Sequence, residues 1–178
     1  MNKVFTGIGA RSTPVIMCSL ITQIAFGFSK KGWLLRSGGA RGADTGMETG
    51  CYKGNGHAEI FIPFAGFNNI EVGQTQNVRY IEPNFHSKKL QKLAAANHPN
   101  WEACDEKVRK FHMRNVCQIL GEKLDSPTSL VICWTPGGEV VGGTGLALRL
   151  AQSLSIPVYN LGKDTEKVKE QLREILRA

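Results

Sequence analysis

Short apolar runs alternate along the chain with longer segments in which apolar positions recur every three or four residues. The short runs have the length of buried strands, and the longer segments have the periodicity of helices packed by one face. The pattern predicts strands at 4–8, 32–35, 58–62, 130–134 and 157–161. It predicts helices at 14–29, 43–52, 101–121 and 144–154, the first with Thr13 as its N-cap, and a final amphipathic helix capped by Asp164.

This alternation of strands and helices predicts the fold class. Parallel neighbours need a long crossover connection, so the class is α/β: a three-layer, Rossmann-like parallel sheet of about five or more strands with helices on both faces. The 178 residues fit a single domain, 1–178. Residues 64–99 break the rhythm, because Gly, Asn and Pro mix there with aromatic residues around one helical patch at 88–96. We expect an irregular insertion or a lid in that segment.

Three glycine-rich turns each follow a short apolar run: Gly7-Ile8-Gly9, the Ser37–Gly42 loop, and Pro136-Gly137-Gly138 continuing to Gly145. Such turns open helices whose first N–H groups have no partner, and several of them at one sheet edge would form a phosphate-binding crevice. Arginine forks, hydroxyls and one carboxylate accompany the glycines, although Asp44 fits helix capping as well as contact with a ribose. The candidate ligand-binding residues from the turns are Gly9, Arg11, Ser37, Gly38, Gly39, Arg41, Asp44, Gly137, Gly138, Gly143 and Thr144.

Charge and cysteine content narrow the class of partner. The net charge of +7 favours an anionic partner, although solubility alone explains many such excesses. The five cysteines form no CxxC pair and the four histidines are scattered along the sequence, so we expect no metal and no other cofactor. Residues 12–29 carry no charge, but Pro14, Gln23 and Gly27 favour a buried helix over a membrane span, which predicts a cytoplasmic protein without membrane contact.

Four motifs resemble the SLOG superfamily: Thr6-Gly-Ile-Gly-Ala-Arg11, Ser37-Gly-Gly-Ala-Arg-Gly-Ala-Asp44, Arg114-Asn115, and Pro136-Gly-Gly with Gly143-Thr144. That grouping contains the DprA/Smf DNA-processing proteins, the lonely-guy nucleotide phosphoribohydrolases and small nucleotide-binding sensor domains. The resemblance implies a nucleotide-type ligand and adds Arg114 to the candidate ligand-binding residues.

Similarity to DprA implies a crevice and basic rim that bind single-stranded DNA in DNA processing or recombination, and this is the first function we expect. The similarity also implies a homo-oligomer, for which the helix at 101–119 is the candidate surface. Basic residues available to track phosphates are Lys30, Lys31, Arg36, Arg79, Lys88, Lys89, Lys107 and Arg109. Aromatic residues available for stacking on bases, or for packing the 64–99 segment onto the core, are Phe64, Phe67, Tyr80, Phe85 and Trp101.

Two other functions follow from the same resemblance. One is a non-catalytic sensor or sequestering protein that binds a small nucleotide-derived molecule. The other is lonely-guy-like hydrolysis of a nucleoside monophosphate, in which Arg114 would match the family's arginine. That family's glutamate position holds Ala147, and Glu139 is the only local substitute. A glycosidic cleavage needs a carboxylate, so this departure argues against an enzyme.

Overall fold

The computed structural model describes residues 3–178 and contains one mixed sheet of seven strands within them. The strands lie in the order β4-β5-β3-β2-β1-β6-β7, and every neighbouring pair is parallel except β4 and β5. Their bounds are β1 Val4–Gly9, β2 Leu34–Ser37, β3 Ala58–Phe61, β4 Gly73–Gln74, β5 Val78–Ile81, β6 Leu130–Trp134 and β7 Val158–Asn160. The α/β class with a mostly parallel central sheet is confirmed.

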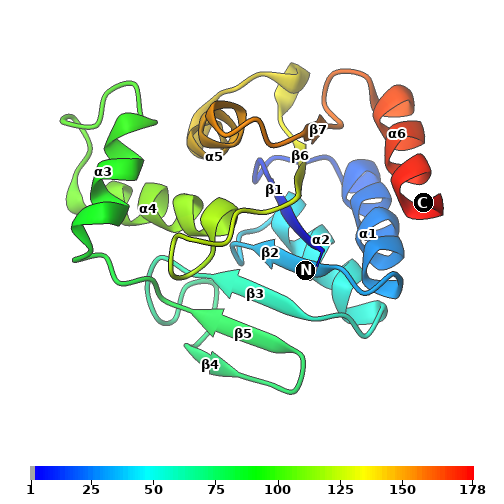
Figure 1. Cartoon of the computed structure of the whole chain (residues 1–178), viewed down its shortest axis with the longest axis horizontal. Coiled ribbons are helices and arrows are strands. Elements are labelled where there is room, and N and C mark those ends of the chain that lie inside the picture. The colour runs from blue at the N-terminus through cyan, green and yellow to red at the C-terminus, as the bar shows by residue number, and fades with distance from the viewer. Residues whose placement is uncertain (1–2) are drawn as a thin grey trace.

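Helices cover both faces of this sheet, which gives three layers (Figure 1). Helices α1, α2 and α6 pack on one face, where Phe5 and Leu35 of the sheet meet Phe28 of α1 in one buried cluster. Helices α3, α4 and α5 pack on the other face, around Ile8 and Val131. The helix bounds are α1 Val15–Lys30, α2 Ala43–Lys53, α3 Lys88–Ala96, α4 Glu106–Leu120, α5 Gly142–Ser153 and α6 Thr165–Arg177.

Local capping explains where the helices begin. Asp164 caps α6 as predicted, because its carboxylate accepts the Lys167 N–H at 3.1 Å. Asp105 caps α4 in the same way through Val108 at 2.8 Å, so the prediction of a helix from residue 101 was wrong by one turn and a half. Thr13 does not cap α1; its hydroxyl donates instead to the Ala10 carbonyl at 2.6 Å.

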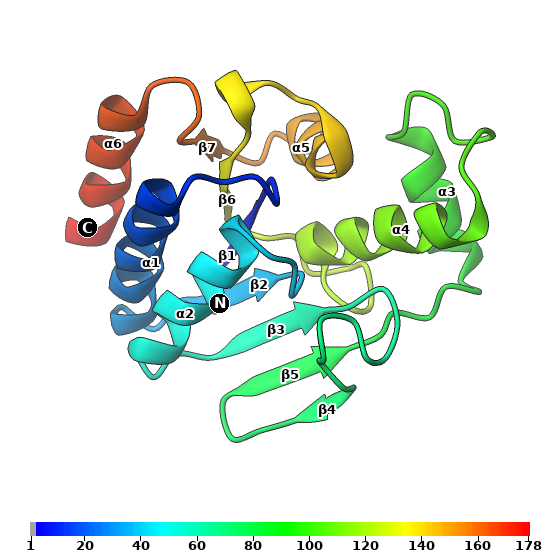
Figure 2. The same cartoon turned by 180° about the vertical axis from the view of Figure 1, so that it is seen from behind.

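Residues 64–99 are more regular than their sequence predicted. β5 adds to the sheet beside β3, and β4 turns back against β5 as a two-residue edge strand (Figure 2). Gly66, Asn68 and Asn69 of this segment have left-handed backbone conformations, with φ values of 81°, 52° and 62°. Its glycine and asparagine content hid two short strands, because they lie between turns and one of them is only two residues long.

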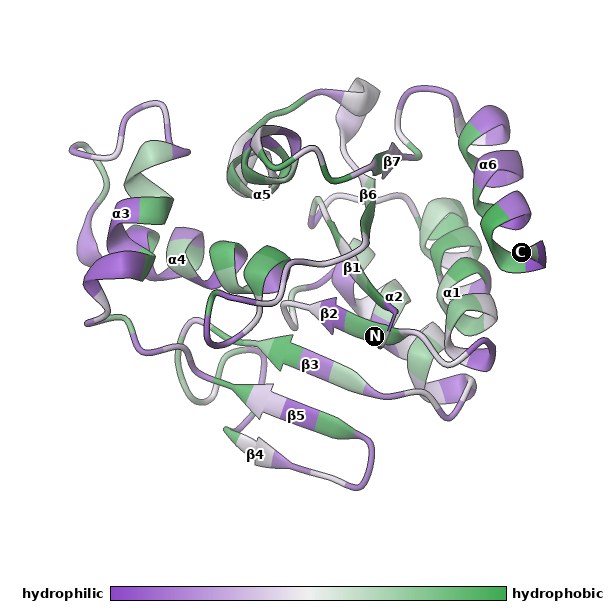
Figure 3. Ribbon diagram, viewed as in Figure 1, coloured by the Kyte–Doolittle hydropathy of each residue, from purple (hydrophilic) through white to green (hydrophobic). Residues whose placement is uncertain are grey.

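Hydropathy follows the layers. In Figure 3, hydrophilic and hydrophobic residues alternate along α6, as expected of a helix with one face on the sheet. Helix α4 is different, since every residue from His112 to Leu120 is buried, polar ones included. No helix among residues 3–178 combines the length and the apolar character needed to cross a bilayer.

Candidate functional site: a cleft at the carboxyl ends of β1 and β6

A cleft of about 1000 Å³ opens where β1 and β6 end. Strands β2 and β3 lie on one side of β1, and β6 and β7 lie on the other, so the chain reverses direction across the sheet between β1 and β6. Open α/β sheets bind ligands at this kind of reversal, because the loops leaving the two strands diverge there. Helix α4 forms the wall of the cleft opposite the strand ends.

Close backbone packing shapes the two loops that follow β1 and β2. Gly42 has φ +82° and faces the carbonyl oxygens of Ala10 and Arg11, which a Cβ would meet at 2.6 and 2.7 Å. Gly9 is equally confined, since a Cβ there would come within 2.6 Å of the Trp134 carbonyl. These glycines let the β1–α1 and β2–α2 loops pack together beside the cleft.

Arg114 is the central charged group of the cleft wall. The Nη1 atom donates to the Gly38 carbonyl at 2.8 Å and lies 3.7 Å from the Asp44 carboxylate. The side chain is 6% exposed and its Nε atom has no hydrogen-bond partner. Burial lowers the pKa of Arg114 below its usual range despite the nearby carboxylates of Asp44 and Glu48. The two carboxylates therefore offset only part of the free-energy cost of burying the Arg114 charge.

Two carboxyl groups lie behind this arginine. Burial raises the pKa of Asp44 to about 6, against the lowering effect of Arg114. Burial and the charge of Asp44 raise the pKa of Glu48 to about 8, although Glu48 accepts the Gly39 N–H at 2.9 Å. Asp44 does not cap α2, whose N-cap is Gly42; its carboxylate accepts the Ala40 N–H at 3.3 Å and lines the cleft.

The first turn of α5 forms a second wall. Gly142 and Gly143 are exposed and line the cleft, and the Asn115 amide donates to the Gly143 carbonyl at 2.7 Å. This bond fixes the start of α5 against α4. The backbone N–H groups of a first helical turn have no partner within the helix, and the positive end of the helix dipole lies there. The wall is therefore suited to an anionic group.

Three buried side chains of α4 line the cleft and each has an atom without a hydrogen-bond partner: His112 Nδ1, Arg114 Nε and Gln118 Nε2. Their exposed fractions are 7%, 5% and 2%. Buried polar atoms in native proteins nearly always have partners, so three on one helix face indicate an unmet interaction. Arg11 and Arg149 add positive charge to the same lining.

The predicted site residues fall into three groups. Gly9, Arg11, Asp44, Arg114, Gly143 and Thr144 line the cleft. Ser37, Gly38 and Gly39 are buried behind the lining, where Gly38 leaves room for the Arg114 guanidinium. Arg41, Gly137 and Gly138 do not line it, and neither does Glu139, which is exposed. Gly138 instead allows a tight approach to Lys163, whose Cβ would lie 2.5 Å from an added Cβ.

Among the lining residues that sequence reasoning missed are His98, His112, Gln118 and Arg149. One signal was available. Arg114 and Gln118 are spaced by four in a segment otherwise apolar enough for the core, and such a spacing places two side chains on one helix face. His98 and Arg149 gave no comparable signal, because each is brought to the cleft by tertiary packing alone.

Several of the expected basic residues interact with other parts of the chain. Arg36 pairs with Glu59 at 2.8 Å, Arg79 pairs with Glu122 at 2.7 Å, and the Lys89 amine donates to the Leu124 carbonyl at 3.0 Å. Of the candidate basic residues for tracking phosphates, none lines the cleft.

The aromatic residues of the 64–99 segment pack against the core of the protein. Phe64 and Phe67 meet each other and Phe111 of α4 in edge-to-face pairs, with ring centroids 5.6 to 6.2 Å apart. The helix expected to mediate self-association is buried in its second half, because residues 112–120 of α4 pack against the sheet and α5, whereas residues 106–108 are exposed.

Comparison with solved structures identifies the fold. The molybdenum cofactor carrier protein of Chlamydomonas reinhardtii is 14% identical, with a TM-score of 0.54, and the match covers 98% of this chain and 85% of that one. DNA processing protein A of Helicobacter pylori, whose structure concerns its binding of single-stranded DNA, is 15% identical with a TM-score of 0.54; the match covers 99% of this chain and 80% of that one.

DprA of Streptococcus pneumoniae is similar over 99% of this chain and 56% of its own length, with 13% identity and a TM-score of 0.53. No family model matches the sequence, and no significant match to a curated protein is found. The likenesses establish the fold as SLOG-type and DprA-like.

Proposed function

We propose that this chain, which has the SLOG-type fold of the DprA proteins, binds a phosphate-bearing nucleotide ligand in the cleft between β1 and β6. One observation carries the proposal: His112, Arg114 and Gln118 are more than nine-tenths buried, line the cleft and keep polar atoms without partners. Small rotations of these side chains would bring the atoms to the cleft surface, where a ligand with hydrogen-bonding edges would pair with them. Leaving such groups unpaired costs about 1–3 kcal/mol each.

The phosphate of that ligand would lie at the α5 end of the cleft. Gly142, Gly143 and Thr144 offer the N–H groups of a first helical turn there. Arg11 is exposed at the mouth of the cleft and is available for a charge-assisted hydrogen bond. The base and sugar would then face the polar side chains of α4.

A small ligand is favoured by the size of the cleft and by what surrounds it. Small-molecule sites commonly enclose about 300–1000 Å³, and this cleft has about 1000 Å³. The candidate basic residues for DNA lie outside the lining, and Arg36, Arg79 and Arg109 have acidic partners. The carrier protein of Chlamydomonas is named for a small molecule as well.

Binding without hydrolysis fits the lining. Its only carboxylate among the described residues is Asp44, which faces Arg114 at 3.7 Å. Ala147 is fully buried, and Glu139 lies outside the cleft. The proposal therefore assigns the cleft to recognition rather than to glycosidic cleavage.

Thermal unfolding with a panel of nucleoside mono-, di- and triphosphates tests the proposal. A ligand at 100 times its Kd stabilises the native state by about 2.7 kcal/mol. We expect at least one nucleotide to raise the Tm, and Arg11→Ala to weaken its binding about tenfold or more. Arg41→Ala is the matched control, since Arg41 is also exposed but lies outside the lining. Equal effects of the two variants, or no nucleotide that raises the Tm, would contradict the assignment.

Single-stranded DNA is the second candidate, supported by the DprA neighbours and by the net charge of +7. Titration with an oligonucleotide at two salt concentrations separates it from a small ligand. Binding to a strand weakens with salt in proportion to the phosphates contacted, with a log–log slope of about −0.7 per phosphate. No binding at the lower salt concentration excludes this candidate.

The proposal includes a cytoplasmic location and self-association. All five cysteines are free thiols, which suits a reducing compartment. Residues 112–120 are buried, so self-association through the expected helix would use its exposed first half, which includes Glu106, Lys107 and Val108. Sedimentation of the chain across a concentration range measures it.

A further inference from the structure

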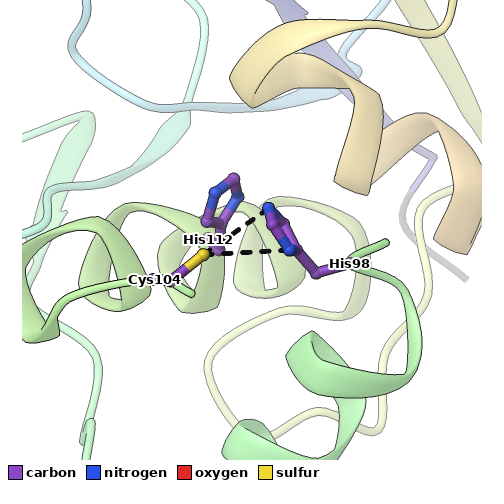
Figure 4. Close-up of side chains that lie close together, drawn as sticks. All are labelled: His98, Cys104 and His112. Atoms are coloured by element: carbon purple, nitrogen blue, oxygen red, sulfur yellow. Dashed lines mark hydrogen bonds between the residues drawn. The ribbon is translucent and has the colours of Figure 1, made fainter. Parts of the chain in front are cut away.

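Three side chains that can bind metals meet at one end of the cleft: His98 after α3, Cys104 before α4, and His112 within α4 (Figure 4). Their ring nitrogen and sulfur atoms all lie within 4.8 Å of one another. The Cys104 Sγ atom is 3.8 Å from both ring nitrogens of His98, and the two imidazole centroids are 4.2 Å apart. His98 and His112 are scattered in the sequence, but the fold brings their rings together.

Two imidazoles and one thiol are a donor set that zinc prefers. Zinc binds thiolate sulfur at about 2.3 Å and histidine nitrogen at about 2.0–2.1 Å, so tetrahedral ligand atoms lie about 3.3–3.6 Å apart. The Cys104 and His98 atoms already approach that separation. Rotation of the two rings and a contraction of about 1 Å would complete the set.

The imidazoles can offer lone pairs. His112 is 7% exposed, and its Nδ1 atom has no hydrogen-bond partner. The Nδ1 atom of His98 uses its one lone pair to accept the backbone N–H of Asn100 at 3.2 Å, so zinc binding at this nitrogen requires that bond to open.

The scaffold around the three groups is ordered by short-range contacts. Cys104 follows a turn closed by its own N–H to the Trp101 carbonyl at 3.0 Å, and Asp105 then caps α4. The Trp101 ring packs against both imidazoles, with centroids 6.1 Å from His98 and 6.5 Å from His112. A 15-residue stretch of sequence thus supplies all three donors from neighbouring positions.

We propose that His98, Cys104 and His112 bind a zinc ion with a fourth coordination position open to the cleft. Both histidines belong to the cleft lining, so water or a ligand atom can reach that position. Three protein ligands and one open position are the pattern of zinc sites that take part in ligand binding, whereas structural sites are closed by four protein ligands. The zinc ion would take His112 from the unpartnered groups of the cleft, and Arg114 and Gln118 would remain for the nucleotide.

Cobalt substitution of the full chain tests this site. After treatment with a chelator, titration with Co²⁺ should give the visible bands of a tetrahedral ion and a sulfur-to-cobalt charge-transfer band at one ion per chain, and Zn²⁺ should displace it. Cys104→Ser should remove the charge-transfer band and weaken Zn²⁺ binding at least tenfold. His98→Ala, at a half-buried position, should weaken Zn²⁺ binding comparably.

Two variants serve as matched controls. Cys18→Ser changes another half-buried thiol, and His86→Ala changes an exposed histidine outside the cluster. Both should bind Co²⁺ as the wild type does. The site is refuted if the wild type shows no charge-transfer band, or if Cys104→Ser binds Zn²⁺ as tightly as the wild type. Nucleotide binding measured after chelation separates failure of this site from failure of the proposed function.

Discussion

Arg114 reaches back across 76 residues of sequence to donate its Nη1 hydrogen to the Gly38 carbonyl. The guanidinium occupies the space that a side chain at position 38 would need, and a Cβ there would coincide with Nη1 and approach the Gln118 amide. The β2–α2 loop and the wall of the cleft are therefore one packed unit.

Gly38→Ala should destabilise the fold by about 2 kcal/mol or more, because overpacking and a broken buried hydrogen bond act together. Urea unfolding measures the change in free energy. Gly143→Ala is the control, since a Cβ at Gly143 meets no atom within 4 Å, and it should stay within about 0.5 kcal/mol of the wild type. Equal stability of the two variants would contradict the close contact between Arg114 and Gly38.

The carboxyl group of Glu48 should make stability depend on pH. Burial and the charge of Asp44 raise its pKa from 4.5 to about 8 in the folded state. The native state then binds the proton more strongly than the unfolded state. The stability gained from protonation is present below pH 4.5 and is lost as the pH rises from 4.5 to about 8. The loss is at most about 1.4 kcal/mol for each pH unit.

Glu48→Gln should remove this dependence while keeping an acceptor for the Gly39 N–H. Its free energy of unfolding, measured between pH 5 and pH 8, should fall less steeply than that of the wild type. Glu174→Gln on the exposed side of α6 should leave the wild-type slope unchanged. Parallel curves for wild type and Glu48→Gln would show that the buried carboxyl does not titrate in this range.

Glu59 holds two arginines, one of them buried. Its carboxylate accepts from Arg36 at 2.8 Å and from Arg79 at 3.2 Å, and the Arg36 side chain is 5% exposed. Removing one partner of a buried pair leaves an uncompensated charge and costs about 3–5 kcal/mol. Glu59→Gln should therefore lower the free energy of unfolding by roughly that amount.

An exposed ion pair gives the comparison. Glu170→Gln breaks the contact with Arg173, whose side chain is 53% exposed, and should change stability far less than Glu59→Gln does. Denaturant midpoints of the two variants rank them directly. A Glu59→Gln protein as stable as Glu170→Gln would mean that water reaches Arg36.

The five thiols should divide into two classes of reactivity. Burial raises the pKa of Cys117 and Cys133 to about 12 and raises that of Cys51, so these three thiols should react only on unfolding. Cys18 and Cys104 are half-buried and should react first. Timed alkylation followed by peptide mass spectrometry gives the order, and reaction of Cys133 before Cys104 would contradict it.

Sequence predicted β1, β2, β3, β6 and β7 because each of them is a short apolar run next to a helix-length segment. All five predicted strands exist, and the turns after β1, β2 and β6 lie at one edge as expected. The prediction failed where strand identity depends on a neighbour. Val78–Ile81 is a strand because β3 offers it hydrogen bonds, and its own residues alternate too weakly to show this.

Sequence predicted those site residues whose positions are set by the backbone of the glycine-rich loops. Gly9, Arg11 and Asp44 lie in motifs whose glycines fix the loops, so their place in the cleft follows from the strand order. Arg41 belongs to the same motif but turns outward, since a motif sets the backbone and not the direction of each side chain. His98 and His112 come together only because α3 and α4 pack, which no local spacing encodes.

Both edge strands of the sheet are short. β4 offers two residues and β7 three, so a strand from another molecule would find few unpaired N–H and C=O groups to pair with. Sheet extension between molecules is correspondingly weak, which guards a chain with so many β-forming runs against fibrous aggregation. Any assembly of copies must then rely on side-chain surfaces, and it can dissociate without breaking a shared backbone ladder.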